Sequence, residues 1–304
     1  MPAGTTHIRS FKVEYDWTPG AAAVTKDIPL QRAPIHAVVA QWDMLGQGAA
    51  AVIASALTAC GTIINLKDGA GDVTPKWTGA ELYEYHNHFF GRIVPFQDGT
   101  AADNKLALMP LVIPMGRPSI LANSSIVMLA DPMVGWNPQG DPFLHIEVPA
   151  DGNAIDGRHL KLWVMYGDQP FRFGKRWTSW TTQTLNTSGP TDWILGNKGS
   201  LCEMFLYQTS AYNDTLTADA PTLKEFEFRR GANSVLTDGK VCNILEALIN
   251  TTPTPDDDYL YLALSMSPMD DFGNCINMNN PANTIFRATG GVADDLKAAF
   301  SVLL

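Results

Sequence analysis

The sequence predicts an all-β fold built from two similar β-sandwich domains in tandem. The chain has 304 residues, which is the length of roughly two domains of about 150 residues each. Short apolar runs alternate with turns that contain Gly or Pro, the pattern of a sandwich or barrel. A third observation is an internal repeat: a short apolar run that ends at a turn glycine occurs at 61–69 and again at 223–231, with the two glycines 162 residues apart. A period this long indicates a duplicated domain and not a solenoid.

Further segments keep the same order in the two halves. The matched pairs are 11–18 with 171–178, 27–30 with 192–195, 35–42 with 201–207, 82–90 with 241–249, and 106–115 with 259–269. An alternative stays open, because any all-β chain shows alternating apolar runs about every dozen residues.

The composition is typical of a β-rich protein that forms interfaces with other protein chains. Hydrophobic residues make up 45% of the chain and charged residues only 17%, below the usual quarter. The eight Trp, eight Tyr and thirteen Phe favour sheets and interfaces over a helical bundle. With a net charge of −10, the whole chain has no electrostatic attraction to nucleic acid, and no specific nucleic-acid contact is expected.

The four cysteines indicate a reducing compartment. Cys60, Cys202, Cys242 and Cys275 are far apart and form no CxxC or other metal-ligand spacing. We expect buried thiols and no disulfides. The first ten residues lack the apolar core of a signal peptide. The uncharged stretch 48–66 is slightly short for a membrane span, and we expect an Ala-rich helix over 49–60 that leads into a buried strand.

The elements expected in the first half follow from alternation and turn residues. Val13, Tyr15 and Trp17 alternate with charged residues, and residues 35–42 form a nearly continuous apolar strand. A helix is expected from about 78 to 90. Prolines are confined to sheet edges and strand ends, and the expected sites of this kind are Pro95, Pro110, Pro114 and Pro118. Residues 143–148 alternate cleanly and form the last strand expected in the first domain.

The turn-rich segment 151–158 predicts the domain boundary, so the expected domains are 1–155 and 156–304. Residues 160–166 would then begin the second domain, with later strands at about 171–180, 193–195, 201–208, 223–228 and 259–266. The polar segment 210–221 is expected to be an exposed loop. At the C-terminus, apolar residues at helical spacing from Val292 to Leu303 predict a short helix over 291–304.

No motif for catalysis or cofactor binding is found, so we name no catalytic, cofactor-binding or metal-ligating residue and expect a protein that is not an enzyme. Three polar features are better explained by structure than by chemistry: the pair His86 and His88, the turn from Asp68 to Asp72, and the acidic run 256–258. The tryptophans at 177, 180 and 193 could stack sugars or bases, although a core or interface role fits them better.

The order of these segments resembles the double jelly-roll major capsid proteins of tailless icosahedral viruses, many of which have an internal membrane. The resemblance rests on the hairpins at 61–69 and 223–231 and on the helical segments near Leu82 and Leu245, and it covers about residues 9–290. It implies two tandem jelly-roll β-sandwiches with a few short helices. It also implies that three chains form a capsomer with a six-fold-like outline, because three chains supply six similar lobes.

We therefore expect a structural, self-assembling major capsid protein of an icosahedral bacteriophage or similar virus, made in the host cytoplasm and located in the virion. Its expected partners are copies of itself, first as a homotrimer and then in a lattice, together with other capsid or vertex proteins. A lipid membrane beneath the shell is implied only by the resemblance. The alternatives are a carbohydrate-binding β-sandwich protein and an enzyme whose carboxylates converge only in three dimensions.

Overall fold

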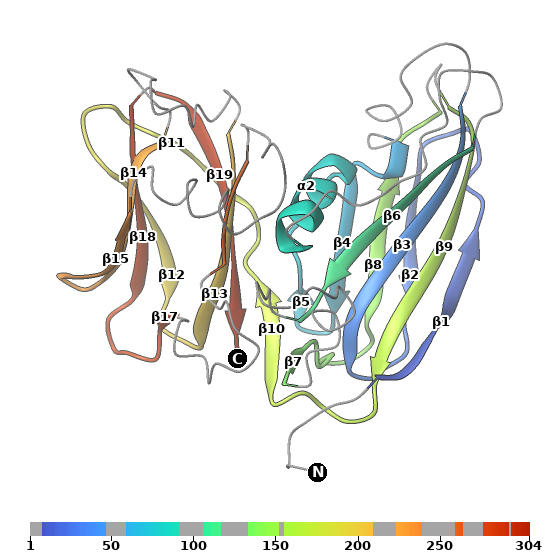
Figure 1. Ribbon diagram of the computed structural model, residues 1–304, viewed down its shortest axis with the longest axis horizontal. Coiled ribbons are helices and arrows are strands. Elements are labelled where there is room, and N and C mark those ends of the chain that lie inside the picture. The colour runs from blue at the N-terminus through green and yellow to red at the C-terminus, as the bar shows by residue number, and fades with distance from the viewer. Residues whose placement is uncertain are drawn as a thin grey trace. The chain divides into compact units, whose positions relative to one another are not determined.

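The chain forms two compact units in the computed structural model, which describes residues 8–46, 59–90, 106–116, 133–151, 155–208, 223–238, 259–263, 276–291 and 293–304. Along the chain, the first unit ends at Arg176 and the second begins at Trp177. We call them the first lobe and the second lobe. Each is a sandwich of mainly antiparallel strands (Figure 1).

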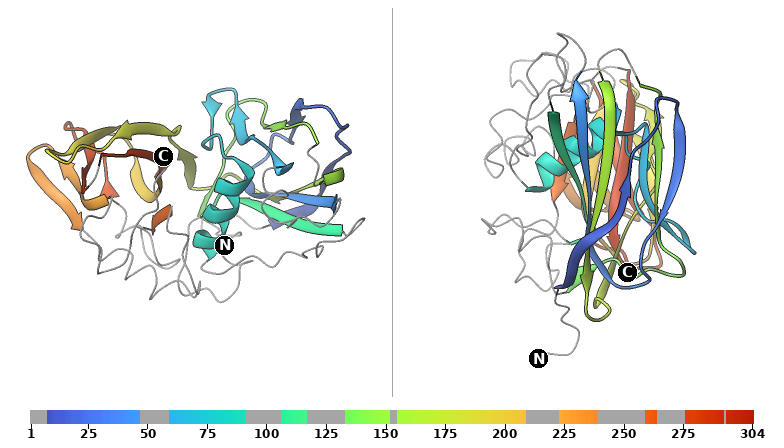
Figure 2. Two further views of the ribbon diagram at one scale, coloured as in Figure 1. Left: turned by 90° about the horizontal axis from the view of Figure 1, so that it is seen from above. Right: turned by 90° about the vertical axis from the view of Figure 1, so that its right-hand side faces the viewer.

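The first lobe contains two four-stranded sheets. One sheet has the order β1-β9-β3-β6, and its strands lie side by side in the right-hand view of Figure 2. The other has the order β2-β8-β4-β5. The strands are β1 (Ile8–Trp17), β2 (Val24–Pro29), β3 (Ile35–Gly46), β4 (Ile63–Asp68), β5 (Gly71–Asp72), β6 (Leu106–Pro114), β8 (Phe143–Val148) and β9 (Ile155–Gly167). Apart from β4 and β5, which form a hairpin within one sheet, consecutive strands thus alternate between the two sheets in the jelly-roll order.

The second lobe repeats this order. One of its sheets is β12-β18-β14-β15, and in the other sheet β16, β13 and β19 are neighbours, with β11 also paired to β19. The strands are β11 (Thr181–Thr184), β12 (Thr191–Gly196), β13 (Ser200–Gln208), β14 (Leu223–Arg230), β15 (Asn233–Asp238), β16 (Tyr259–Ala263), β18 (Thr284–Gly290) and β19 (Asp295–Leu303). The remaining strands are β7 (Val134–Gly135) in the first lobe, β10 (Phe173–Trp177) where the first lobe ends and the second begins, and β17 (Ile276–Asn277) in the second lobe.

The two lobes therefore correspond strand by strand. The sheet order β2-β8-β4-β5 matches β12-β18-β14-β15, and β9-β3-β6 matches β19-β13-β16. The all-β, jelly-roll fold predicted from the sequence is confirmed. The matched segments 27–30 with 192–195, 35–42 with 201–207, and 61–69 with 223–231 lie in corresponding strands. The partner expected for the helix, 241–249, lies outside the described residues.

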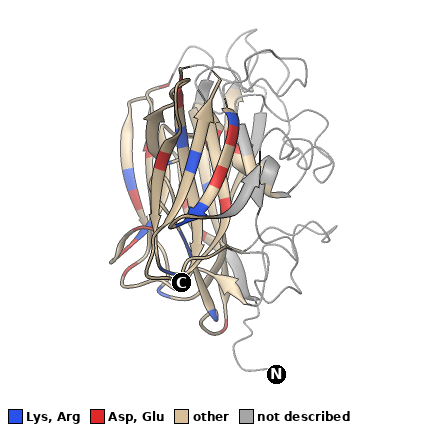
Figure 3. Ribbon diagram, turned by 90° about the vertical axis from the view of Figure 1, so that its left-hand side faces the viewer, with Lys and Arg blue, Asp and Glu red and all other residues tan. Residues whose placement is uncertain are grey.

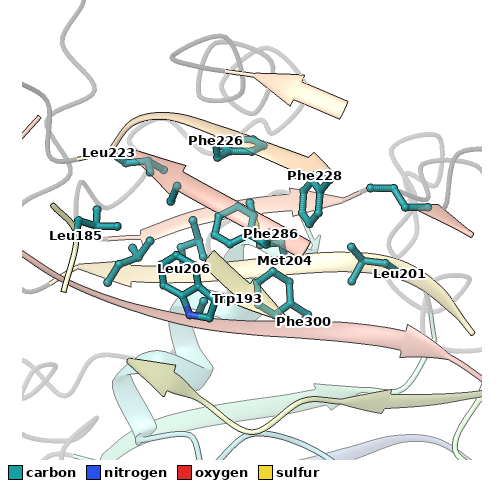
Figure 4. Close-up of a cluster of buried hydrophobic side chains, with 14 of the residues drawn as sticks. Leu185, Trp193, Leu201, Met204, Leu206, Leu223, Phe226, Phe228, Phe286 and Phe300 are labelled. Atoms are coloured by element: carbon teal, nitrogen blue, oxygen red, sulfur yellow. The ribbon is translucent and has the colours of Figure 1, made fainter. Parts of the chain in front are cut away.

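Burial explains why these segments are strands. In β8, Leu144, Ile146 and Val148 are almost completely buried, while His145 and Glu147 alternate with them on the other face. The second lobe has a core of aromatic rings between its sheets. Phe286 lies 5.2 Å from Phe228 and 5.4 Å from Phe300 between ring centroids, and Figure 4 shows these side chains together. Such pairs add about 0.5–1.5 kcal/mol each beyond the burial of their area.

The predicted helix over 78–90 is confirmed as α2 (Gly79–Phe90). It begins with a capping box, since the Thr78 backbone N–H donates to Glu81 Oε2 at 2.8 Å and the Glu81 N–H donates to Thr78 Oγ1 at 3.2 Å. Tyr85 holds the helix against the first lobe by stacking on Trp77, with ring centroids 5.1 Å apart.

The structure moves the domain boundary. Residues 155–167 form β9, which pairs with both β1 and β3, so this segment is the last strand of the first lobe. Of the turn-rich segment 151–158, residues 155–158 already belong to β9, and residues 151–154 lie between β8 and β9 in the chain. The chain accordingly leaves the first lobe at Arg176, after the expected boundary between 155 and 156.

The predicted C-terminal helix is wrong, because residues 295–303 form β19. Leu296, Ala298 and Phe300 face the aromatic core of the second lobe. Ala299 and Ser301 lie on the opposite face of the strand and are also fully buried. A strand covered on both faces loses the alternation that identifies strands, so its apolar run was mistaken for a helical face.

Other sequence predictions have mixed outcomes. Pro110 and Pro114 lie in β6, an edge strand of its sheet, as expected. The segment 210–221, the acidic run 256–258, Pro95 and Pro118 lie outside the described residues. So does the expected helix over 49–60, apart from its last two residues, which are helical.

Candidate functional site

The polar features singled out in the sequence serve structural roles where they are described. His86 lies in α2 and is buried, and residues two apart on a helix do not share a face, so the His86–His88 spacing does not converge on a metal. Residues 68–72 form the turn of the β4–β5 hairpin, with Lys67 opposite Asp72. No group of three or more metal-ligating side chains is found in the described part of the chain.

Asp68 anchors a buried network at this hairpin. Its Oδ2 accepts hydrogen bonds from Arg176 Nη2 at 2.5 Å, from Trp136 Nε1 at 3.2 Å and from the Gln139 backbone N–H at 3.0 Å. Its Oδ1 accepts from the Ala70 N–H at 2.9 Å. Burial by itself raises the pKa of this carboxyl, but these donors outweigh burial, and the pKa lies below its ordinary value. The network ties distant segments together and leaves no reactive carboxylate.

A second buried carboxylate lies in the second lobe. Glu203 is fully buried, and its two oxygens accept hydrogen bonds from Tyr261 Oη at 2.8 Å and Ser301 Oγ at 2.7 Å. The three residues come from β13, β16 and β19, so the carboxylate joins three adjacent strands. This contact was not predicted from the sequence, where a single Glu inside the otherwise apolar run 201–207 is the available signal.

Two of the three tryptophans singled out in the sequence are buried. Trp177 and Trp193 are buried, and Trp193 packs on Phe286 with ring centroids 5.2 Å apart. Trp180 is half-buried, with Lys297 Nζ lying 4.5 Å from its ring centroid. They do not form an exposed row for stacking sugars.

The described cysteines are buried, as expected. They are Cys60 and Cys202, while Cys242 and Cys275 lie outside the described residues. Burial raises the pKa of the Cys60 thiol well above its usual value, and the nearby Arg158 charge offsets this only in part. Such a thiol is unreactive at neutral pH.

The described residues include no group of three or more metal-ligating side chains, and the exposed face of the β12-β18-β14-β15 sheet is the candidate functional site. Acidic and basic residues are interspersed on the strands that face the viewer in Figure 3. Arg287 lies between Asp192 and Glu227 in the register across β12, β18 and β14. Its Nε donates to Asp192 Oδ1 at 2.6 Å and its Nη2 donates to Asp192 Oδ2 at 2.7 Å. The hydrogen bonds from Arg287 lower the pKa of Asp192, and their effect is larger than that of burial, which acts in the opposite direction.

An exposed isoleucine interrupts this charged face. Ile194 is 72% exposed although it lies inside strand β12, and Ile285 is its direct neighbour on β18. Strand β12 pairs only with β18 among the described strands. On its other edge no described strand is paired, and the Asp192 carbonyl accepts a hydrogen bond from Gln183 Nε2 at 3.0 Å.

The first lobe has the same arrangement with one difference. Strand β2 is also an edge strand, and its Asp27 contacts His145 on β8 at 2.6 Å, just as Asp192 contacts Arg287. Two residues after each aspartate, β2 carries Pro29 where β12 carries Ile194.

Among the described residues, none of the helical segments has the length and hydropathy needed to cross a bilayer. The strand β4 occupies residues 63–68, the end of the uncharged stretch noted in the sequence.

Solved structures with the same fold are viral capsid proteins. The major capsid protein P2 from bacteriophage PM2 superposes with a TM-score of 0.64 at 11% identity, over 97% of this chain and 96% of that chain. The STIV major capsid protein gives 0.64 at 10% identity, over 96% and 95%. A chain of the PBCV-1 virus capsid gives 0.53 at 10% identity, over 97% and 94%. No protein-family model and no curated protein matches the sequence.

Proposed function

We propose that this chain, which has the double jelly-roll fold of viral major capsid proteins, is itself a major capsid protein. It would associate as a trimer with a pseudo-hexagonal outline and then assemble an icosahedral shell. The observation that carries the proposal is the strand-by-strand correspondence of the two lobes over a match that spans 97% of this chain and 96% of the PM2 capsid protein.

The physical basis is packing of similar lobes. Three chains supply six lobes with one strand order, and six similar lobes can occupy nearly equivalent positions around one axis. Low charge content and abundant aromatic residues suit large obligate interfaces, which bury about 2,000–5,000 Å² and are more apolar than transient ones. Vertex proteins and an internal membrane remain further proposed partners.

The proposed role requires no chemistry from the chain. Among the described residues, the buried carboxylates Asp68, Glu81 and Glu203 all accept hydrogen bonds that hold strands or a helix end in place. We therefore propose a structural protein and not an enzyme.

Light scattering coupled to gel filtration tests the trimer. The expected mass is three times the 33.1 kDa of one chain, over a tenfold range of concentration. A mass of one chain throughout that range would overturn the proposal.

A further inference from the structure

The open edge of β12 differs from its counterpart in the first lobe in a way that matters for pairing. In the first lobe, the Leu30 backbone N–H donates to Pro142 O at 2.9 Å, on the side of β8. Because alternate residues of a strand point their N–H groups to opposite sides, the position of Pro29 faces the open edge. Proline has no N–H to donate there, so it disfavours pairing of another strand with this edge.

At the corresponding place, β12 offers both a backbone N–H and an apolar side chain. The correspondence is fixed by the contacts on either side. Asp27 and Asp192 each bind the basic side chain directly opposite, and the residues that follow, Ile28 and Trp193, are both buried. The next residue is exposed in both strands, Pro29 in one and Ile194 in the other.

The charges around Ile194 are already paired within the chain. Asp192 is bound by Arg287, and Arg229 Nε lies 3.6 Å from Glu227 Oε1. Among the described residues, an incoming strand therefore meets an apolar step formed by Ile194 and Ile285 and no unpaired charge beside it. Two residues earlier, the Asp192 carbonyl accepts a hydrogen bond from Gln183 Nε2 at 3.0 Å, and the pairing strand shares this acceptor.

We propose that this edge is a contact with a second copy of the chain, in which two β12 strands lie antiparallel about a two-fold axis at Ile194. The inference rests on the proposed function and assigns a contact between capsomers. In an isologous contact, a residue on the axis meets its own copy. A row of four isoleucines then crosses the junction, and Asp192 falls opposite a glycine, Gly196 of the partner subunit.

Other two-fold registers are less favourable. An axis at Asp192 would place two carboxylates opposite each other, and an axis at Trp193 would place Ile194 against a carboxylate. A bulge between Ile194 and Gly196 ends the regular register of β12, so the contact is short. A short contact of this kind suits reversible joining of capsomers better than formation of the trimer.

Disulfide trapping tests the geometry. Paired residues that exchange both hydrogen bonds have Cα atoms about 5.5 Å apart, within the range of a disulfide. Both cysteine variants are made in a protein that carries Cys242→Ser and Cys275→Ser. Under mild oxidation, Ile194→Cys is expected to form a disulfide-linked dimer at least about ten times faster than Val13→Cys. Val13 is a matched control, since it is 41% exposed on another edge strand, β1. Equal rates for the two variants would overturn the inference.

The substitution Ile194→Pro tests the edge in assembly, because it installs the residue that the first lobe carries. The trimer and its unfolding midpoint in urea should be unchanged, while association of trimers at high concentration, followed by sedimentation velocity, should weaken about tenfold or more. Ile194→Lys should act in the same direction. Unchanged association in both variants would overturn the contact and leave the trimer proposal intact. A monomeric wild-type protein would instead overturn the trimer proposal, and the disulfide test would still decide the contact.

Discussion

Arg176 Nη2 lies 2.5 Å from Asp68 Oδ2, and this ion pair joins residues 108 positions apart in the chain. The Asp68 side chain is completely buried, whereas the Arg176 side chain is 18% exposed. The pair therefore fastens the end of the first lobe to the β4–β5 hairpin.

Removing the buried partner should destabilise the first lobe strongly. We expect Asp68→Ala to lower the free energy of unfolding by about 3–5 kcal/mol, because Arg176, Trp136 and the Gln139 N–H lose their shared acceptor. Urea unfolding followed by tryptophan fluorescence measures the change. Asp16→Ala is the control, since its side chain is 60% exposed and its loss should cost at most about 1 kcal/mol. Equal costs for the two variants would contradict the role assigned to Asp68.

The same carboxylate should contribute to acid sensitivity. Its pKa is lowered in the folded protein, so it stabilises the fold above the ordinary aspartate pKa of about 3.9 and loses this effect as pH falls through the lower folded value. The difference in unfolding free energy between wild type and Asp68→Asn should be constant from about pH 8 to 5. Below about pH 4 it should shrink. A difference that narrows between pH 8 and 5 would argue against a lowered pKa.

The exposed ion pair between Asp192 and Arg287 should matter less. Its side chains are 37% and 28% exposed, so solvent and salt screen it. We expect Asp192→Asn to cost about 0.5–1 kcal/mol at low salt and close to nothing in 1 M NaCl. Urea unfolding at the two salt concentrations measures this. A cost that survives 1 M salt would show that the pair is not screened as its exposure implies.

The aromatic core of the second lobe should depend on Phe286, whose ring lies 5.2 Å from both Trp193 and Phe228. Phe286→Ala should lower stability by about 3–5 kcal/mol and alter tryptophan emission, because it leaves a cavity beside Trp193. Ile194→Ala is the matched control, since its side chain is 72% exposed and its removal should change stability by at most about 0.5 kcal/mol. A comparable loss in both variants would contradict the assignment of the core.

The cap of α2 provides a smaller effect that can be separated from the core. Thr78→Ala should cost about 1 kcal/mol, because it leaves the Glu81 N–H without its hydroxyl acceptor. A double-mutant cycle with Glu81→Ala should show coupling between the two residues, since they form one capping box. Strictly additive effects would indicate that the box does not form in solution.

The repeat could be predicted from the sequence because strand alternation and turn glycines are patterns formed by residues close together in the chain. Segments 27–30 and 192–195 were matched in this way, and they are the two edge strands β2 and β12. The last strand was not readable, because β19 is buried on both faces and shows no alternation. The boundary could not be predicted correctly because the residue types of 151–158 are those of a linker, and only the pairing of β9 with β1 and β3 shows that β9 belongs to the first lobe.

Long-range polar contacts also escaped the sequence. Nothing near Asp68 indicates that Arg176 will meet it, and the correct hairpin prediction said nothing about the network. The match between Pro29 and Ile194 was present in the aligned segments, but only the structure shows that both residues are exposed beside an open edge.

Electron cryo-microscopy of the purified protein tests the central proposal most directly. The account predicts particles with three-fold symmetry in which six similar sandwich lobes surround one axis. Particles made of a single two-lobed chain, or rings with another symmetry, would contradict it.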